Sequence, residues 1–339
     1  MLPNERHYRK TVGAIGGAML IFWGIINIGG SGIAFLPFLL SLLGASTEVV
    51  NVVYQTVYAA VYLLSFMLPV AFLKMFIRKA GYSYTSMRCE VKMSGYVPLI
   101  MLAGVAVIYG LAQINASMVS IFDYSDFLFE IMGGAGESPA LYQLVLEFIT
   151  LCVVPGFCEE FLFRGAILTN CLPFGRSNAI LISALLFSMM HQNAGQLLYT
   201  FAAGILLGVV YERTGNIWTC TVLHIFNNFI SLVQGVIGEK LGIGIKGFMG
   251  NALFETLLML VGTVSAVILI LRFFSHKEDF SSGFFGRSVP AEDGYAPCSV
   301  EASRMRKLFF TPTMVIFLIL CALQILFLLV MAVFYGLFV

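Results

Sequence analysis

PGFCEEFLFRGAILTN, residues 155–170, places two adjacent carboxylates and an arginine inside an apolar run of about thirty residues. Ionisable side chains within a membrane span are costly, so by default they mark a functional site. On a helix, Glu160 and Arg164 are i and i+4 neighbours, in the order that favours an ion pair. Glu159 points about 100° away from Glu160 around the helix axis. Its partners must therefore come from elsewhere in the chain.

The composition is that of an integral membrane protein. Of 339 residues, 59% are hydrophobic and 11% are charged, whereas soluble proteins carry about 25% charged residues. The net charge of +1 gives no indication of nucleic acid or of acidic partners. The seven cysteines form no CxxC pair, which argues against a zinc–thiolate or disulfide framework.

Hydropathy predicts an all-α fold, a polytopic bundle of eight or nine transmembrane helices with the active site inside the bundle. The first apolar run is too long for a cleaved signal peptide. It is interrupted by Gly29, Gly30, Gly32 and Pro37, so we expect either one tilted helix or a helix followed by a half-helix. A crossing needs about 20 residues, and the candidate spans are 12–42, 50–76, 96–119, 140–170, 177–193, 195–211, 216–236, 251–273 and 309–337.

The connections between these spans predict orientation and organisation. Basic residues gather before the first span, after the second and before the last, which predicts an internal N-terminus and, for nine spans, an external C-terminus. We divide the chain into N-terminal transmembrane helices (1–120), a core (140–236) and C-terminal transmembrane helices (250–339). Within the last region, the Ser, Gly, Pro and charge content of 275–307 predicts a mobile cytoplasmic loop.

Four polar side chains of the core lie at comparable depths. Measured from the predicted cytoplasmic ends at about 1.5 Å per residue, Glu159 lies roughly 18 Å and His191 roughly 21 Å into the membrane. His224 and Asn228 lie about 12 Å and about 18 Å deep, and at i and i+4 they share one helix face. Depth therefore permits a carboxylate, two imidazoles and a carboxamide to meet.

Two further helix faces accompany these side chains. Phe187 and His191, in FSMMH, are i and i+4, so an aromatic ring should lie one turn before the imidazole. Gly204 and Gly208 form a small-xxx-small face that lets helices approach closely. We expect this face to draw the fifth and seventh spans together.

The chemistry that this set suits is addition of water to an amide. A carboxylate in a low-dielectric setting can act as general base, the role expected of Glu159. His191 would hold the water, directly or through a metal, and His224 and Asn228 would donate hydrogen bonds to the developing oxyanion.

Three motifs resemble those of the CAAX-protease and bacteriocin-processing family, the ABI-type intramembrane proteases. EEFLFR (159–164) fits the EExxxR motif, FSMMH (187–191) fits FxxxH, and HIFNN (224–228) fits HxxxN. They occur in the expected order and spacing within about residues 140–235.

The resemblance implies an intramembrane endopeptidase that acts near the cytoplasmic face on a membrane-associated protein or peptide. It also implies a set of site residues, with the first four at the catalytic centre and the last two beside it: Glu159, His191, His224, Asn228, Glu160 and Arg164. Glu159, His191 and His224 are candidate ligands of a divalent metal such as zinc. The same residues can also activate water without a metal, as in a glutamate protease.

Other classes fit the sequence less well. A catalytically inactive scaffold or immunity-type protein of the same fold is the alternative, but every motif position is filled. A transporter would usually show an internal repeat, and none is visible. GIGIKG (242–247) follows no strand, so no nucleotide site is expected, and no nucleic acid partner is expected either. We expect a multi-pass protein of a bacterial plasma membrane, in contact with the lipid bilayer.

Overall fold

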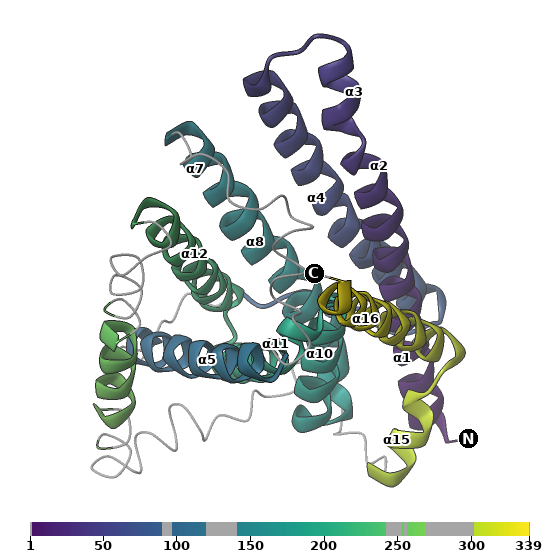
Figure 1. Ribbon diagram of the computed structural model, residues 1–339. Helices are drawn as coiled ribbons and strands as arrows, with labels where there is room; N and C mark the ends of the chain where they lie inside the picture. Colours follow the sequence, from purple (N-terminus) through teal and green to yellow (C-terminus); the bar gives the residue numbers. More distant parts are fainter. Residues whose placement is uncertain are drawn as a thin grey trace. The chain divides into compact units, whose positions relative to one another are not determined.

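The structure, a computed structural model, describes residues 2–89, 97–119, 141–241, 256–268 and 302–338, together with Leu253 and Leu271. Within these residues the regular elements are helices (Figure 1), and the single β-bridge joins Cys89 to Asn216. The predicted all-α class is therefore confirmed for the part of the chain that the structure describes.

The chain divides into two compact units. The first comprises Met1–Met87, Tyr142–Ala179 and Pro297–Leu320, and the second comprises Arg88–Leu141, Ile180–Ala296 and Cys321–Val339. The EExxxR segment belongs to the first unit, whereas the FxxxH and HxxxN segments belong to the second.

The helices of the first unit fall in two groups. The N-terminal group is α1 (Pro3–Gly24), the π-helical η1 (Ile25–Gly29), α2 (Gly30–Ala34), α3 (Leu36–Leu42) and α4 (Thr47–Lys79). The later group is α7 (Leu141–Glu147), η3 (Phe148–Val153), α8 (Val154–Glu160), η4 (Phe161–Leu168), α9 (Thr169–Cys171), η5 (Leu172–Phe174) and α15 (Ala302–Phe309).

The second unit contains α5 (Val97–Val119), α11 (Ala194–Thr214) and α12 (Ile217–Leu241). The boundary between the units falls within α10 (Arg176–Met190) and within α16 (Pro312–Phe338).

Within the described residues, four helical stretches are long and apolar enough to cross a membrane: Pro3–Leu42, Thr47–Lys79, Ala194–Thr214 and Pro312–Phe334. Four shorter apolar helices occupy Pro98–Ile114, Arg176–Met190, Ile217–Val233 and Thr256–Ile268. An integral membrane protein is the class that these helices support. The total of eight or nine spans stays a prediction.

The first two long helices form an antiparallel hairpin. A Cβ on Gly17 would lie 2.9 Å from Phe72, and one on Gly29 would lie 2.8 Å from Val61. Because the partner number falls as the glycine number rises, the two helices run in opposite directions. The Pro3–Leu42 stretch is helical over nearly its whole length, with a wider π turn at η1, as the single-helix alternative predicted.

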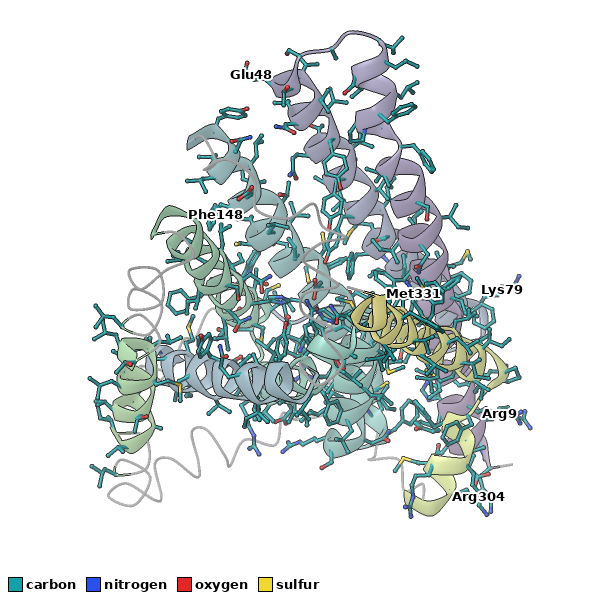
Figure 2. The ribbon with its side chains drawn as sticks, viewed as in Figure 1. Arg9, Glu48, Lys79, Phe148, Arg304 and Met331 are labelled. Atoms are coloured by element: carbon teal, nitrogen blue, oxygen red, sulfur yellow. The ribbon has the colours of Figure 1, made fainter. Side chains whose placement is uncertain are left out.

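Opposite ends of this hairpin carry opposite charge. Arg9 on α1, Lys79 on α4 and Arg304 on α15 lie toward one end of the first unit, and Glu48 lies at the other (Figure 2). Arg304 forms an ion pair with Glu5, which ties α15 to α1. The cations therefore gather where the sequence predicts the cytoplasmic side.

The predicted polar loop at 275–307 is only partly visible. Residues 275–301 lie outside the described residues. The remaining residues belong to α15, whose sequence ASRMRKLF alternates basic and apolar side chains at helical spacing. Here the composition that suggested a loop is that of an amphipathic helix.

Small residues bring the helices of the second unit close together. A Cβ on Gly204 of α11 would lie 2.8 Å from the Cα of Ala184 on α10. One turn further along α11, the Cys220 thiol of α12 donates to the Leu207 carbonyl at 3.4 Å. The expected close approach at Gly204 is therefore confirmed for the helix that precedes α11.

We predict that Gly204→Ala lowers the thermal unfolding midpoint in detergent. The new methyl meets backbone at 2.8 Å, and overpacking of this kind costs about 1–3 kcal/mol. Gly24→Ala is the matched control, since nothing lies within 4 Å of its Cβ position and alanine favours the helix. Equal midpoints for the two variants would contradict the close packing of α10 on α11.

Candidate active site

Glu160 and Arg164 form the predicted i,i+4 ion pair. The Arg164 guanidinium donates to the Glu160 carboxylate at 2.9 Å, and both side chains are 0% exposed. Removing one partner of a buried ion pair is strongly destabilising, because the other charge is then left unpaired in apolar surroundings. The pair is therefore a fixed feature of the helix that runs from α8 into η4.

The backbone around this pair departs from a regular α-helix. The π-helical segments η3 and η4 flank α8, which begins with Val154 and Pro155. Proline has no N–H to donate to the preceding turn. The regular α-helical hydrogen bond is therefore missing at Pro155, directly after the π-helical segment η3. Directly after η4, the Thr169 hydroxyl of α9 donates to the Arg164 carbonyl at 2.8 Å. Such π turns occur often at functional sites.

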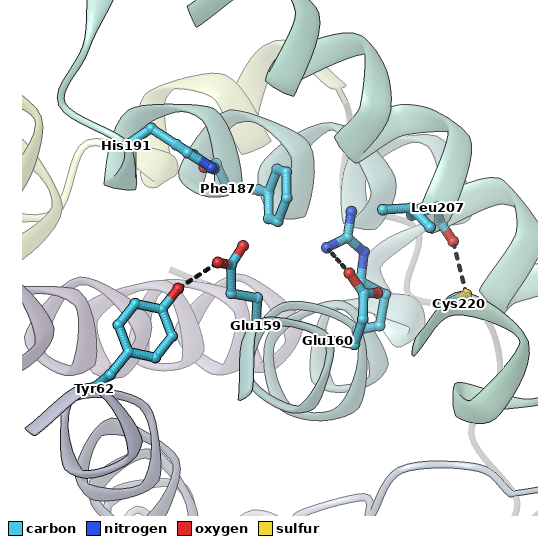
Figure 3. A network of polar contacts seen from close by, with 8 residues as sticks. Tyr62, Glu159, Glu160, Phe187, His191, Leu207 and Cys220 are labelled. Atoms are coloured by element: carbon cyan, nitrogen blue, oxygen red, sulfur yellow. Dashed lines mark hydrogen bonds and ion pairs between the residues drawn. The ribbon is translucent and has the colours of Figure 1, made fainter. Parts of the chain in front are cut away.

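Glu159 has a different partner from Glu160. The Tyr62 hydroxyl of α4 donates to the Glu159 carboxylate at 2.5 Å (Figure 3), and Glu159 is 4% exposed. The sequence analysis missed Tyr62. The only signal was the four-residue spacing of Tyr54, Tyr58 and Tyr62, which marks one helix face without indicating what it meets.

The C-terminal end of this helix is held by an extended segment. The Thr85 N–H donates to the Asn170 side-chain oxygen at 3.0 Å, and the Asn170 amide donates to the Thr85 carbonyl at 3.1 Å. Asn170 thus pairs with the extended chain as a neighbouring strand would. Met87, two residues after Thr85, packs against the same helix, because a Cβ on Gly165 would lie 3.2 Å from it. The turn that follows the carboxylates is therefore tightly enclosed within the first unit.

In the second unit, His191 lies just past the end of α10. Its Nδ1 donates to the Phe187 carbonyl at 2.7 Å. A carbonyl can only accept, so the neutral ring carries its proton on Nδ1, and Nε2 keeps the lone pair. Gln192, with φ of 52°, reverses the chain, and the Asn193 side chain then caps α11 at the Gly195 N–H, at 2.8 Å.

Phe187 contacts the imidazoles of His191 and His224 edge-on. Its ring centroid lies 5.1 Å from that of His191 and 5.8 Å from that of His224, in T-shaped contacts. The aromatic residue of FSMMH is thus the common neighbour of the two histidines. The expectation of an aromatic ring beside His191 is confirmed.

His191, His224 and Asn228 line one cavity of about 80 Å³ in the second unit. This volume holds a few water molecules. The Asn227 amide donates to the Asn228 side-chain oxygen at 3.5 Å. The oxygen of the Asn228 side chain thus acts as an acceptor, and its NH2 group is the donor end. Further polar lining comes from residues that the sequence analysis did not single out: Tyr199, Thr200, Asn227 and Ser231.

The six predicted site residues thus form two groups, one in each unit. Glu159, Glu160 and Arg164 share consecutive turns of one helix in the first unit, and the histidines and Asn228 share one cavity in the second. That the two groups meet in one catalytic centre stays a prediction.

The candidate metal ligands, Glu159, His191 and His224, belong to both groups. Among the residues that the structure describes, no group of three or more His, Cys, Asp or Glu side chains is arranged to hold a metal ion. A catalytic zinc takes three protein ligands. That Glu159, His191 and His224 ligate a metal stays a prediction.

Buried ionisable side chains in apolar helices are typical of an integral membrane protein in which such groups have a function. Residues 141–230 match the family model described as Type II CAAX prenyl endopeptidase Rce1-like. The chain therefore contains an Rce1-like domain, and the resemblance drawn from the three motifs is confirmed. At the family level, this domain supports a CAAX-type protease. No curated protein and no solved structure matches the chain.

We predict that Arg164→Met strongly destabilises the protein, because it leaves the Glu160 carboxylate buried without its cation. Removing one partner of a buried pair costs about 3–5 kcal/mol, measurable as a lower unfolding midpoint in detergent. The double variant Glu160→Gln/Arg164→Met should recover part of this loss, since no net charge is then buried. Arg78→Met, at an exposed arginine, should have little effect. A double variant no more stable than Arg164→Met would argue against the pair.

Proposed function

We propose that the protein is an intramembrane endopeptidase that hydrolyses a peptide bond of a membrane-associated protein or peptide near the cytoplasmic face. The observation that carries this proposal is the Rce1-like match over 141–230, in which every position of the three motifs is filled. Buried ionisable groups in apolar helices support it, because such groups are retained where they have a task.

In the proposed reaction, Glu159 removes a proton from a water molecule as the water oxygen attacks the carbonyl carbon of the scissile peptide bond. His224 and Asn228 donate hydrogen bonds to the oxyanion that forms. The C–N bond then breaks, and the proton held by Glu159 passes to the leaving nitrogen. The products are one new carboxyl terminus and one new amino terminus, and the enzyme returns to its starting state.

His191 has the role of holding the water. Its Nδ1 is engaged by the Phe187 carbonyl, so Nε2 is the atom that accepts from the water or ligates a metal. Glu160 and Arg164 are proposed to keep the helix ordered and its charge balanced. If a divalent cation such as zinc is bound, its ligands would be Glu159, His191 and His224. The cation would supply Lewis-acid polarisation of the water and the carbonyl.

The membrane arrangement proposed with this function has nine spans, an internal N-terminus and an external C-terminus in a bacterial plasma membrane. The regions 1–120 and 250–339 would surround a protease core at 140–236. A catalytically inactive scaffold or immunity-type protein is the competing proposal. It predicts that the Glu159 carboxylate is dispensable for the cellular effect of the protein.

We predict that Glu159→Gln, His191→Ala and His224→Ala each abolish cleavage without preventing membrane insertion. Loss of a general base costs about 10²–10⁴-fold in rate, and Asn228→Ala should cost about 10²–10³-fold through the oxyanion. The measurement is a quantitative comparison of membrane-associated peptides in cells that carry wild type or Glu159→Gln. Glu48→Gln, the same change at an exposed site, is the control. Normal turnover by Glu159→Gln would contradict the proposed mechanism.

Elemental analysis of the purified protein separates the two catalytic types. A stoichiometric divalent metal that His191→Ala loses, with chelator inhibition reversed by adding the metal back, would establish a metalloprotease. Full activity after exhaustive chelation would establish a glutamate protease.

A further inference from the structure

Tyr62 belongs to none of the three motifs, yet it is the residue that contacts the proposed general base. It lies on α4, 97 residues before Glu159, and its hydroxyl donates to one carboxylate oxygen at 2.5 Å (Figure 3). Both residues belong to the first unit, where α4 packs against α8 and η4.

The Tyr62 ring is held in place by its neighbours on α4. Its centroid lies 5.8 Å from that of Tyr58 and 4.9 Å from that of Phe66. Phe66 is fully buried and packs edge-on against Phe22 of α1, at 5.0 Å. A ring packed on both sides loses little further freedom when its hydroxyl makes a hydrogen bond, so Tyr62 is suited to fixing the position of another side chain.

The chemistry of the partner distinguishes the two adjacent carboxylates. Arg164 forms a buried ion pair with Glu160, so that carboxylate is already engaged by a cation. Tyr62 is a neutral donor, so it orients Glu159 without cancelling its charge. A general base acts through one oxygen, and a donor on the other oxygen restricts rotation of the carboxylate about its terminal torsion.

We infer that Tyr62 is a positioning residue of the reaction, whose hydroxyl holds one oxygen of Glu159 so that the other is aimed at the attacking water. This inference rests on the proposed function. In this role Tyr62 acts through Glu159 and not on the substrate or the water directly. A mere structural link between α4 and α8 would affect stability but not the rate per folded molecule.

The test is Tyr62→Phe in the full-length chain, reconstituted in nanodiscs, with Tyr58→Phe as the matched control one turn away on the same helix face. The probe is a fluorogenic peptide built on a cleavage site that distinguishes wild-type cells from Glu159→Gln cells. We expect kcat of Tyr62→Phe to fall about 10- to 100-fold, with KM within about twofold, because misplacement affects the transition state more than ground-state binding. Tyr58→Phe should stay within about twofold of wild type.

A double-mutant cycle on thermal stability tests the contact without using activity. Tyr62→Phe should lower the unfolding midpoint in the wild-type background. In a Glu159→Leu background, where the acceptor is gone, the same change should not lower it. The cycle also reports directly whether Tyr62→Phe is folded.

The outcomes separate this inference from the proposed function. If Glu159→Gln is inactive but Tyr62→Phe keeps the wild-type kcat, the inference is wrong and the protease proposal stands. A change in KM alone, or additive effects in the thermal cycle, would also overturn the inference. If Glu159→Gln itself cleaves normally, it is the proposed function that fails.

Discussion

The structure of the candidate site depends on how charge is accommodated inside an apolar helix. Glu160 and Arg164 are fully buried, and removing two charges from water is repaid only when they pair with good geometry. Their i,i+4 spacing provides that geometry within one helix, without help from a distant segment. Hydrogen bonds then hold the neighbouring turns. The Thr169 hydroxyl donates to the Arg164 carbonyl, and the Asn170 side-chain oxygen accepts from the Thr85 N–H of the extended segment. A short run of sequence thus creates a stable place for a buried carboxylate in apolar surroundings from which ionised groups are otherwise excluded.

This arrangement gives two adjacent glutamates different partners. Glu160 has a cationic partner and contributes order, whereas Glu159 has a neutral hydroxyl partner. The helical rotation of about 100° between neighbours directs the two carboxylates to different surroundings. Identical side chains one residue apart can therefore serve structure and chemistry respectively.

Features governed by local geometry were predictable from the sequence, and features governed by helix pairing were not. The Glu160–Arg164 pair, the ring beside His191 and the close approach at Gly204 follow from i,i+4 spacing or from small side chains. The Tyr62–Glu159 contact depends on the register between two helices far apart in sequence, which local periodicity does not specify. Helix limits were missed for a related reason. Hydropathy detects the apolar part of α1 and the charge of α15, but the hydrogen-bonded helix includes polar turns such as those at Glu5 and Arg304.

The FxxxH spacing also has a local physical cause. In a continuing α-helix, the Phe187 carbonyl would accept from the His191 N–H. Here α10 ends, and the His191 N–H donates to the Ser188 carbonyl instead, at 3.2 Å. The His191 Nδ1 takes the place of the backbone donor on Phe187. The end of the helix therefore places the imidazole so that its Nδ1 lies on the Phe187 carbonyl. Since the Phe187 ring also contacts His224, a spacing of four residues fixes the proton on one histidine and the packing of both.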